Sequence, residues 1–105
     1  MQAVARVGDL ESGICPVGPS SSAGPLPIAS GSHNVFANGM PVARAGDPYT
    51  GVHVAIPSPY TPHPVFCGAG STRVFVNGIP VYRQGDFTAC QSPQIQGSPN
   101  VFAGG

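Results

Sequence analysis

Charged residues are scarce in this 105-residue sequence, and one common type is missing. There is no lysine and no tryptophan, and four arginines balance four acidic residues to give a formal net charge of zero. Proteins that bind nucleic acid usually present a positively charged surface to the phosphates. Because so few cations, matched by as many acids, cannot form such a surface, we expect no nucleic-acid partner.

Long apolar runs are also missing. No stretch approaches the roughly 18 apolar residues that suggest a transmembrane helix. The first residues, MQAVARVGDLES, lack the charged start and the apolar core of a signal peptide. We therefore expect a protein that is made in the cytoplasm without a signal peptide. If it leaves the cell, another component must carry it.

Segments that favour a helix are rare because glycine and proline are abundant. The chain holds 15 glycines and 13 prolines. Proline removes a backbone donor, and glycine costs about 1 kcal/mol inside a helix. Valine, isoleucine and phenylalanine instead gather in short runs, so we expect one all-β domain over residues 1–105. Three cysteines, an odd number, argue against a closed disulfide framework, which leaves a metal ion as one source of extra stability.

A 17-residue pattern occurs twice. GSHNVFANGMPVARAGD spans residues 31–47, and GSTRVFVNGIPVYRQGD spans residues 70–86. Each copy places Asn-Gly between β-branched residues, which is the strongest short-range signal of a β-hairpin. The proline after each turn cannot donate to a ladder, so that side of the strand faces an edge or a bulge. Each copy therefore predicts one hairpin.

A third copy is split between the chain ends. GSPNVFAGG, residues 97–105, supplies its first half, and MQAVARVGD, residues 1–9, supplies its second half. We expect these segments to pair and to close a third hairpin. Three like units closed head to tail approximate a three-fold axis, and a monomer of this kind can sit on the end of a true trimer.

Each unit ends in Arg-x-Gly-Asp, which accounts for most of the charges. The Gly-Asp predicts a turn in which the Asp side chain accepts from backbone N–H groups just ahead. One interpretation is an internal ion pair in each unit. The other is a ring of arginines that contacts the carbonyl groups of a partner. The residues concerned are Arg6, Arg44 and Arg83, followed by Asp9, Asp47 and Asp86.

The segments PVAR and PVYR, with NVFANG and VFVNG before them and AGD and QGD after them, resemble the PAAR-repeat proteins. The resemblance covers nearly the whole chain, although Val42 and Val81 stand where the motif has alanine. It implies a small cone of β-hairpins whose broad base binds the end of a trimeric β-helical spike, one tip per trimer. It also implies a sharp apex that a metal, usually zinc, holds together.

The resemblance further implies a function and a location. Such proteins form the tip of type VI secretion spikes and of contractile phage tails, where they help to puncture a target membrane, and some couple effector cargo to the spike. A bacterial protein of this kind is located at the tip of the machine and is delivered outward on contraction. The sequence leaves open which of the two machines uses this tip.

The expected metal ligands follow the repeat. Cys15 and His53 each lie six residues after the Asp of a unit, and Cys90 lies four residues after one. The three connecting segments would thus bring one ligand each to the same end. His63, between two prolines, would add a fourth, and a set of imidazole and thiolate ligands favours a closed zinc site over iron. By resemblance, His53, His63 and Cys90 match the usual ligands, while His33 is the alternative to Cys15.

Two residues receive other interpretations. His33 precedes a hairpin strand and is expected on the surface, and Cys67 is expected to be a small buried side chain. The connecting segments 10–30, 48–69 and 87–96 are expected to be rigid irregular loops because of their proline and glycine content. At the hairpins, valine and phenylalanine alternate, so one of the two sets should point inward and the other outward.

Two other functions are weighed against the spike tip. A small zinc hydrolase would need a water-activating cleft and a carboxylate such as Glu11, and no Gly-x-Ser-x-Gly nucleophile motif is present. An adaptor that carries a cargo protein would use the connecting segments, which contain no cargo motif. We expect a structural protein without enzymatic activity.

Overall fold

A computed structural model describes residues 2–12, 25–53, 63–89 and 92–104 of the chain, and these ranges contain strands, turns and bridges but no helix. The strands are β1 (Gln2–Ala3), β2 (Phe36–Ala37), β3 (Met40–Pro41), β4 (Pro48–His53), β5 (His63–Phe66), β6 (Phe75–Val76), β7 (Ile79–Pro80) and β8 (Phe102–Ala103). The prediction of an all-β chain is confirmed for these residues.

The first two repeat units each form a short hairpin. β2 pairs with β3, and β6 pairs with β7, both antiparallel. Both turns have positive φ at two successive residues, 56° and 79° at Asn38-Gly39 and 56° and 77° at Asn77-Gly78. Asparagine and glycine tolerate this left-handed conformation, which matches the twist of the flanking strands. The turns are those that the Asn-Gly pairs predict.

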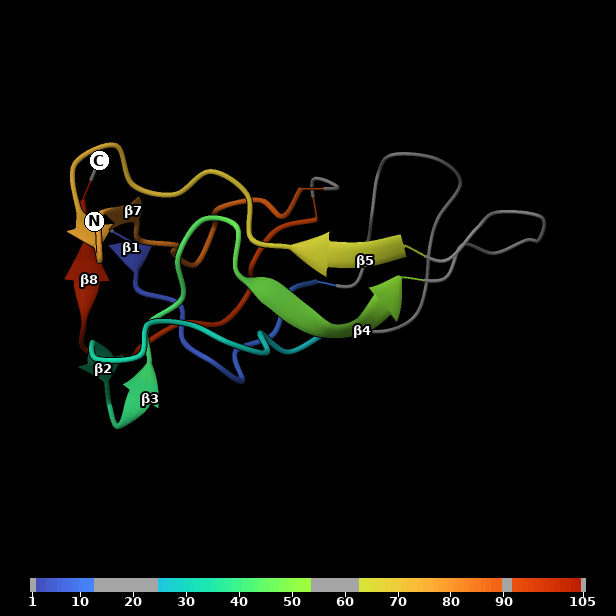
Figure 1. Cartoon of the computed structure of the whole chain (residues 1–105), viewed down its shortest axis with the longest axis horizontal. Helices are drawn as coiled ribbons and strands as arrows, with labels where there is room; N and C mark the ends of the chain where they lie inside the picture. The colour runs from blue at the N-terminus through green and yellow to red at the C-terminus, as the bar shows by residue number, and fades with distance from the viewer. Residues whose placement is uncertain (1, 13–24, 54–62, 90–91, 105) are drawn as a thin grey trace.

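The chain ends supply the third pair of strands. β1 pairs antiparallel with β8, with Gln2 opposite Ala103 and Ala3 opposite Phe102. This is the pairing that the split third copy predicts. All three short strand pairs lie at one end of the molecule, and both chain ends lie there too (Figure 1).

A closed triangle of backbone hydrogen bonds joins the three units. Ala5 N–H donates to Tyr82 O at 2.9 Å, Tyr82 N–H donates to Ala43 O at 3.0 Å, and Ala43 N–H donates to Ala5 O at 2.9 Å. These three residues hold the same position in their units, just before the arginine. Each unit thus donates to one neighbour and accepts from the other, so the three units are arranged with approximate three-fold symmetry.

The core consists of two clusters of buried side chains. One consists of small and β-branched side chains: Val4, Ala37, Val42, Val76, Val81 and Ala103. The other contains larger residues: Ala5, Leu26, Ile28, Ala43, Tyr49, Val65, Cys67 and Tyr82. Tyr82 stands where the other units have Ala5 and Ala43, so one large buried side chain fills space that two alanines leave.

The longest connecting segment differs from its expected form. It was expected to be an irregular loop, but β4 and β5 pair antiparallel within it, with Val52 opposite Pro64 and His53 opposite His63. Valine, tyrosine and phenylalanine favour strands, and both prolines lie where a pair can tolerate them, at or beside a strand start. The register shifts between Pro48 and Val52, where Gly51 has a φ of 90°. Gly51 permits this irregularity within the strand pair. The proline and glycine content of the segment predicted only a loop.

Candidate functional site: the ring of hairpins and the far end of the molecule

Each Arg-x-Gly-Asp forms a closed local unit. In the split copy, Asp9 N–H donates to Arg6 O at 3.0 Å, and Gly8 has a φ of 94°. A positive φ at the third residue is typical of a type II turn. The Asp9 carboxylate accepts from the Arg6 backbone N–H at 2.9 Å and from its guanidinium at 2.9 and 3.0 Å. The predicted turn and the predicted Asp acceptor are both confirmed here.

The same pairing occurs in all three units. Arg44 pairs with Asp47 at 3.1 Å, and Arg83 pairs with Asp86 at 2.9 Å. The hydrogen bond to Asp9 is the main reason that the pKa of Arg6 is raised. The structure therefore shows the internal ion pairs. The contact between these three arginines and a partner stays a prediction, and their burial favours the structural role.

The arginines also join neighbouring units. Arg6 Nη1 donates to Asn38 Oδ1 at 3.0 Å, and Arg83 Nη1 donates to the Gly104 carbonyl at 3.0 Å. Each guanidinium thus spans its own turn and the hairpin turn of the next unit. Because these bonds link residues far apart in the sequence, they fix the units relative to one another.

Six apolar side chains are exposed at the hairpins, and we call them the apolar ring. They are Val35, Phe36, Val74, Phe75, Val101 and Phe102, with exposed fractions of 37–38% for the valines and 50–56% for the phenylalanines. The expectation that either valine or phenylalanine points inward is wrong, because both are exposed. The inward position is the next residue along, where Ala37, Val76 and Ala103 are buried. The small side chain after each Phe was the signal in the sequence.

Serine and asparagine side chains, which sequence reasoning missed, link the units beside the ring. Ser32 Oγ donates to Asn77 Oδ1 at 2.6 Å, and Ser98 Oγ donates to Asn38 Oδ1 at 2.5 Å. In the third case Ser71 Oγ donates to the Gly104 carbonyl at 2.5 Å. The Gly-Ser that opens every copy was the available signal.

The expected metal ligands are only partly described. Cys15 and Cys90 lie outside the described residues, as do the side chains of His53 and His63. The backbone register nevertheless places His53 directly opposite His63. They stand where β4 ends and β5 begins, at the end of this strand pair away from the hairpins (Figure 1).

The remaining His and Cys candidates lie elsewhere. His33 is exposed and precedes β2 at the hairpin end, so it does not join the other two histidines. Cys67 is buried and forms no disulfide, as the interpretation of a small core residue predicts. Where side chains are described, no three His, Cys, Asp or Glu residues lie together as a metal site would require.

Cys67 lies in the buried core cluster that also contains Tyr49 and Tyr82. Tyr49 Oη donates to Gln94 Oε1 at 2.5 Å and lies 3.1 Å from Tyr82 Oη. Burial raises the pKa of Cys67 and of both tyrosines. All three therefore stay neutral at physiological pH and act as hydrogen-bonding core residues.

The acidic side chains are all engaged or buried. The three aspartates are paired with arginines. Glu11, the carboxylate on which a hydrolase would depend, is fully buried and accepts from Leu26 N–H at 3.0 Å. None of the four acidic residues is placed at an open surface.

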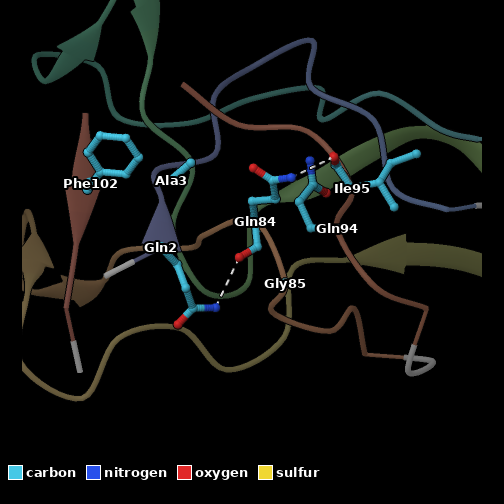
Figure 2. A pocket seen from close by; sticks show the side chains of 7 residues that line it. All are labelled: Gln2, Ala3, Gln84, Gly85, Gln94, Ile95 and Phe102. Atoms are coloured by element: carbon cyan, nitrogen blue, oxygen red, sulfur yellow. Dashed lines mark hydrogen bonds between the residues drawn. The ribbon is translucent and has the colours of Figure 1, made fainter. Parts of the chain in front are cut away.

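An open hollow lies where β1 meets the short third connection. Figure 2 shows its lining: Gln2, Ala3, Gln84, Gly85, Gln94, Ile95 and Phe102. The amide groups of Gln2 and Gln84 donate to the carbonyls of Gln84 and Ile95, at 3.0 and 3.1 Å. No ionisable side chain lines this hollow, so it offers no general acid or base of its own.

These features define an all-β protein with three like units closed around one axis. The PAAR motif matches residues 2–51, which include the end of the split copy and the whole of the first unit. The second unit, beyond the match, has the same turn and the same ion pair. Residues 2–51 thus carry the motif that characterises the PAAR-repeat proteins. A search of the curated proteins found no match.

The motif suggests a spike-tip or adaptor role in contractile injection systems, and the family that it defines is structural rather than enzymatic. The described residues include no helix that is long and apolar enough to cross a membrane.

Proposed function

We propose that this protein caps the end of a trimeric β-helical spike in a contractile injection machine, a type VI secretion system or a phage tail, and sharpens it for membrane puncture. The apolar ring carries the proposal. Its three Val-Phe pairs come from three like units and leave one large exposed phenylalanine per unit.

The geometry of the ring suits a partner with true three-fold symmetry. Each chain of a trimer would meet one Val-Phe pair, so the same contact would form three times. Exposed apolar patches of this kind in a small protein commonly mark an interaction surface. The inter-unit bonds of Arg6, Arg44 and Arg83 hold the ring rigid before binding, which lowers the entropic cost of docking.

The test uses the trimeric spike protein encoded in the same genome, purified and mixed with this chain. Native mass spectrometry should detect one copy per trimer. Replacing the ring residues Phe36 and Phe75 with serine should abolish the complex, because each exposed aromatic contributes much of its contact area. Phe87→Ser is the matched control, since Phe87 is as exposed as Phe36 but lies outside the ring. Unimpaired binding by the ring variant would refute the proposal.

We also propose a structural zinc ion at the far end of the molecule, bound by Cys15, His53, His63 and Cys90. The opposed register of His53 and His63 supports this set, because residues directly opposite on paired antiparallel strands share one face of the sheet. Zinc bound there would tie three connecting segments together and would stabilise the folded state.

Elemental analysis of protein purified without added metal should find about one zinc per chain. A chelator should then lower the melting temperature, and His63→Ala should lower both the zinc content and the melting temperature. His33→Ala is the control and should change neither. A folded protein without metal would refute the zinc site and leave the spike-cap proposal standing.

A cargo adaptor is the second candidate function. Phe66, Phe87 and Ile95 are exposed and lie outside the ring, which leaves apolar surface on the flank of a docked tip. A pull-down that recovers a partner other than the spike, and loses it on Phe87→Ser, would favour this function.

A further inference from the structure

Arg73 breaks the three-fold pattern beside the apolar ring. The residue before the ring valine is Asn34 in the first unit and Asn100 in the third. Asn34 Oδ1 accepts from Asn77 Nδ2 at 2.8 Å, and Asn100 Oδ1 accepts from Asn38 Nδ2 at 2.8 Å. Both asparagines are thereby held by the turn of a neighbouring hairpin.

The neighbour of Arg73 cannot make the same contact. The position of the turn asparagine is taken by Gly104, which has no side chain and accepts from Ser71 and Arg83 through its carbonyl oxygen. Gly104 therefore provides no side-chain amide that could donate a hydrogen bond to residue 73. The Arg73 side chain is exposed and forms no hydrogen bond or ion pair within the part of the chain that the structure describes.

No acidic side chain among the described residues pairs with Arg73. The other three arginines each pair with an aspartate, and the remaining acid, Glu11, is fully buried. Arg73 is exposed and directly precedes Val74 of the apolar ring, so it borders that surface. A single positive charge thus accompanies six apolar side chains.

We propose that Arg73 binds an aspartate or glutamate carboxylate of the spike chain that docks on the apolar ring. This inference rests on the proposed spike-cap function and names the partner's chemistry. The planar guanidinium forms paired hydrogen bonds with a carboxylate, which a protein partner supplies as an acidic side chain. A symmetric trimer offers three equivalent carboxylates, and the one Arg73 engages one of them, while Asn34 and Asn100 face the other two chains.

A charge at the edge of an interface acts mainly on the association rate and on the salt dependence of binding. The test measures binding of the purified trimeric spike protein to this chain at low salt and at about 1 M salt, where the Debye length falls to about 3 Å. Arg73→Asn, which restores the residue of the other two units, should weaken binding about 5- to 10-fold at low salt. The difference should vanish at high salt. At low salt, the affinity of Arg73→Lys should lie between those of the wild type and Arg73→Asn.

Thr50→Glu is the matched control, because it changes the net charge by the same amount at an exposed position on β4 away from the ring. It should leave binding unchanged. If Arg73→Asn binds like the wild type, or weakens binding no more than Thr50→Glu does, the Arg73 contact is refuted while the spike cap stands. If the wild-type chain does not bind the trimer at all, both proposals fail.

Discussion

At the scale of single residues, most of the few charged side chains serve in the ion pairs that stabilise the turns. Arg6 and Asp9 are nearly buried, with side-chain exposures of 11% and 8%, and the pair satisfies the turn and a neighbouring unit at once. A lone buried charge is strongly destabilising, so neither partner is dispensable. The repeated Arg and Asp are therefore structural requirements of the ring.

Replacing one member of a pair should have a large effect. Asp9→Asn removes the negative charge and leaves Arg6 buried, so we expect a loss of about 3 kcal/mol in the free energy of unfolding. Urea denaturation measures it. Arg73→Asn is the control, since the exposed Arg73 side chain forms no ion pair with any described residue, and its effect should stay within about 0.5 kcal/mol. Equal losses in the free energy of unfolding for the two substitutions would show that the Arg6–Asp9 pair does not stabilise the fold.

Cys67 should be protected in the folded protein. Thiol reagents attack the thiolate, and burial both raises the pKa of Cys67 and blocks access. Iodoacetamide at mildly alkaline pH, followed by peptide mapping, should label Cys67 only after unfolding. Since the folded pKa is raised, the stabilising contribution of the neutral thiol is complete below the unfolded pKa of about 8.5 and declines above it. Rapid labelling of Cys67 in the native protein would contradict this placement.

At the scale of elements, the two turns offer a paired test. Gly39 and Gly78 have φ of 79° and 77°, and a Cβ at either position would meet no atom within 4 Å. Replacement by alanine therefore adds backbone strain without a clash. We expect Gly39→Ala and Gly78→Ala each to lower the free energy of unfolding by about 1–2 kcal/mol, to a similar extent. Thermal denaturation of the two variants side by side would reveal any difference between the hairpins.

The hairpins were predictable because their information is local. Asn-Gly and the flanking β-branched residues specify a turn and two strands without reference to the rest of the chain. The pair β4–β5 was not predictable in this way, because its strands are joined by a long segment and contain proline. The inward position at Ala37, Val76 and Ala103 was also missed, since alternation alone does not say which of two faces meets the core.

At the scale of the whole molecule, the repeat predicts that the three units close on one another, but it does not predict where a contact between units is missing. The split copy predicts the pairing of the chain ends, but only the structure shows that Gly104 replaces a turn asparagine and that the Arg73 side chain has no hydrogen-bond partner among the described residues. Side-chain contacts between units depend on three-dimensional neighbours that no local pattern specifies. The expected metal site draws on residues far apart in the sequence for the same reason, and it stays a prediction.

The closed ring implies that the chain ends are essential to folding. Val4 N–H donates to Val101 O at 2.9 Å, and Ser98 N–H donates to Val4 O at 2.8 Å. Removal of residues 97–105 would eliminate β8, one Val-Phe pair of the apolar ring and the contact from Ser98 to Asn38. Because every unit bonds to both neighbours, loss of one half-unit should unfold the whole ring, and circular dichroism should show no cooperative thermal transition.

A circular permutant separates the loss of the strand from the loss of chain length. Joining residue 105 to residue 1 through a short glycine linker would turn the split copy into a continuous hairpin like the other two. New ends between residues 20 and 21 would leave every described strand intact. We expect this permutant to fold and to melt cooperatively, because all three strand pairs and the backbone triangle are preserved. A cooperative transition in the truncated chain, or none in the permutant, would show that pairing of the ends does not hold the three units together.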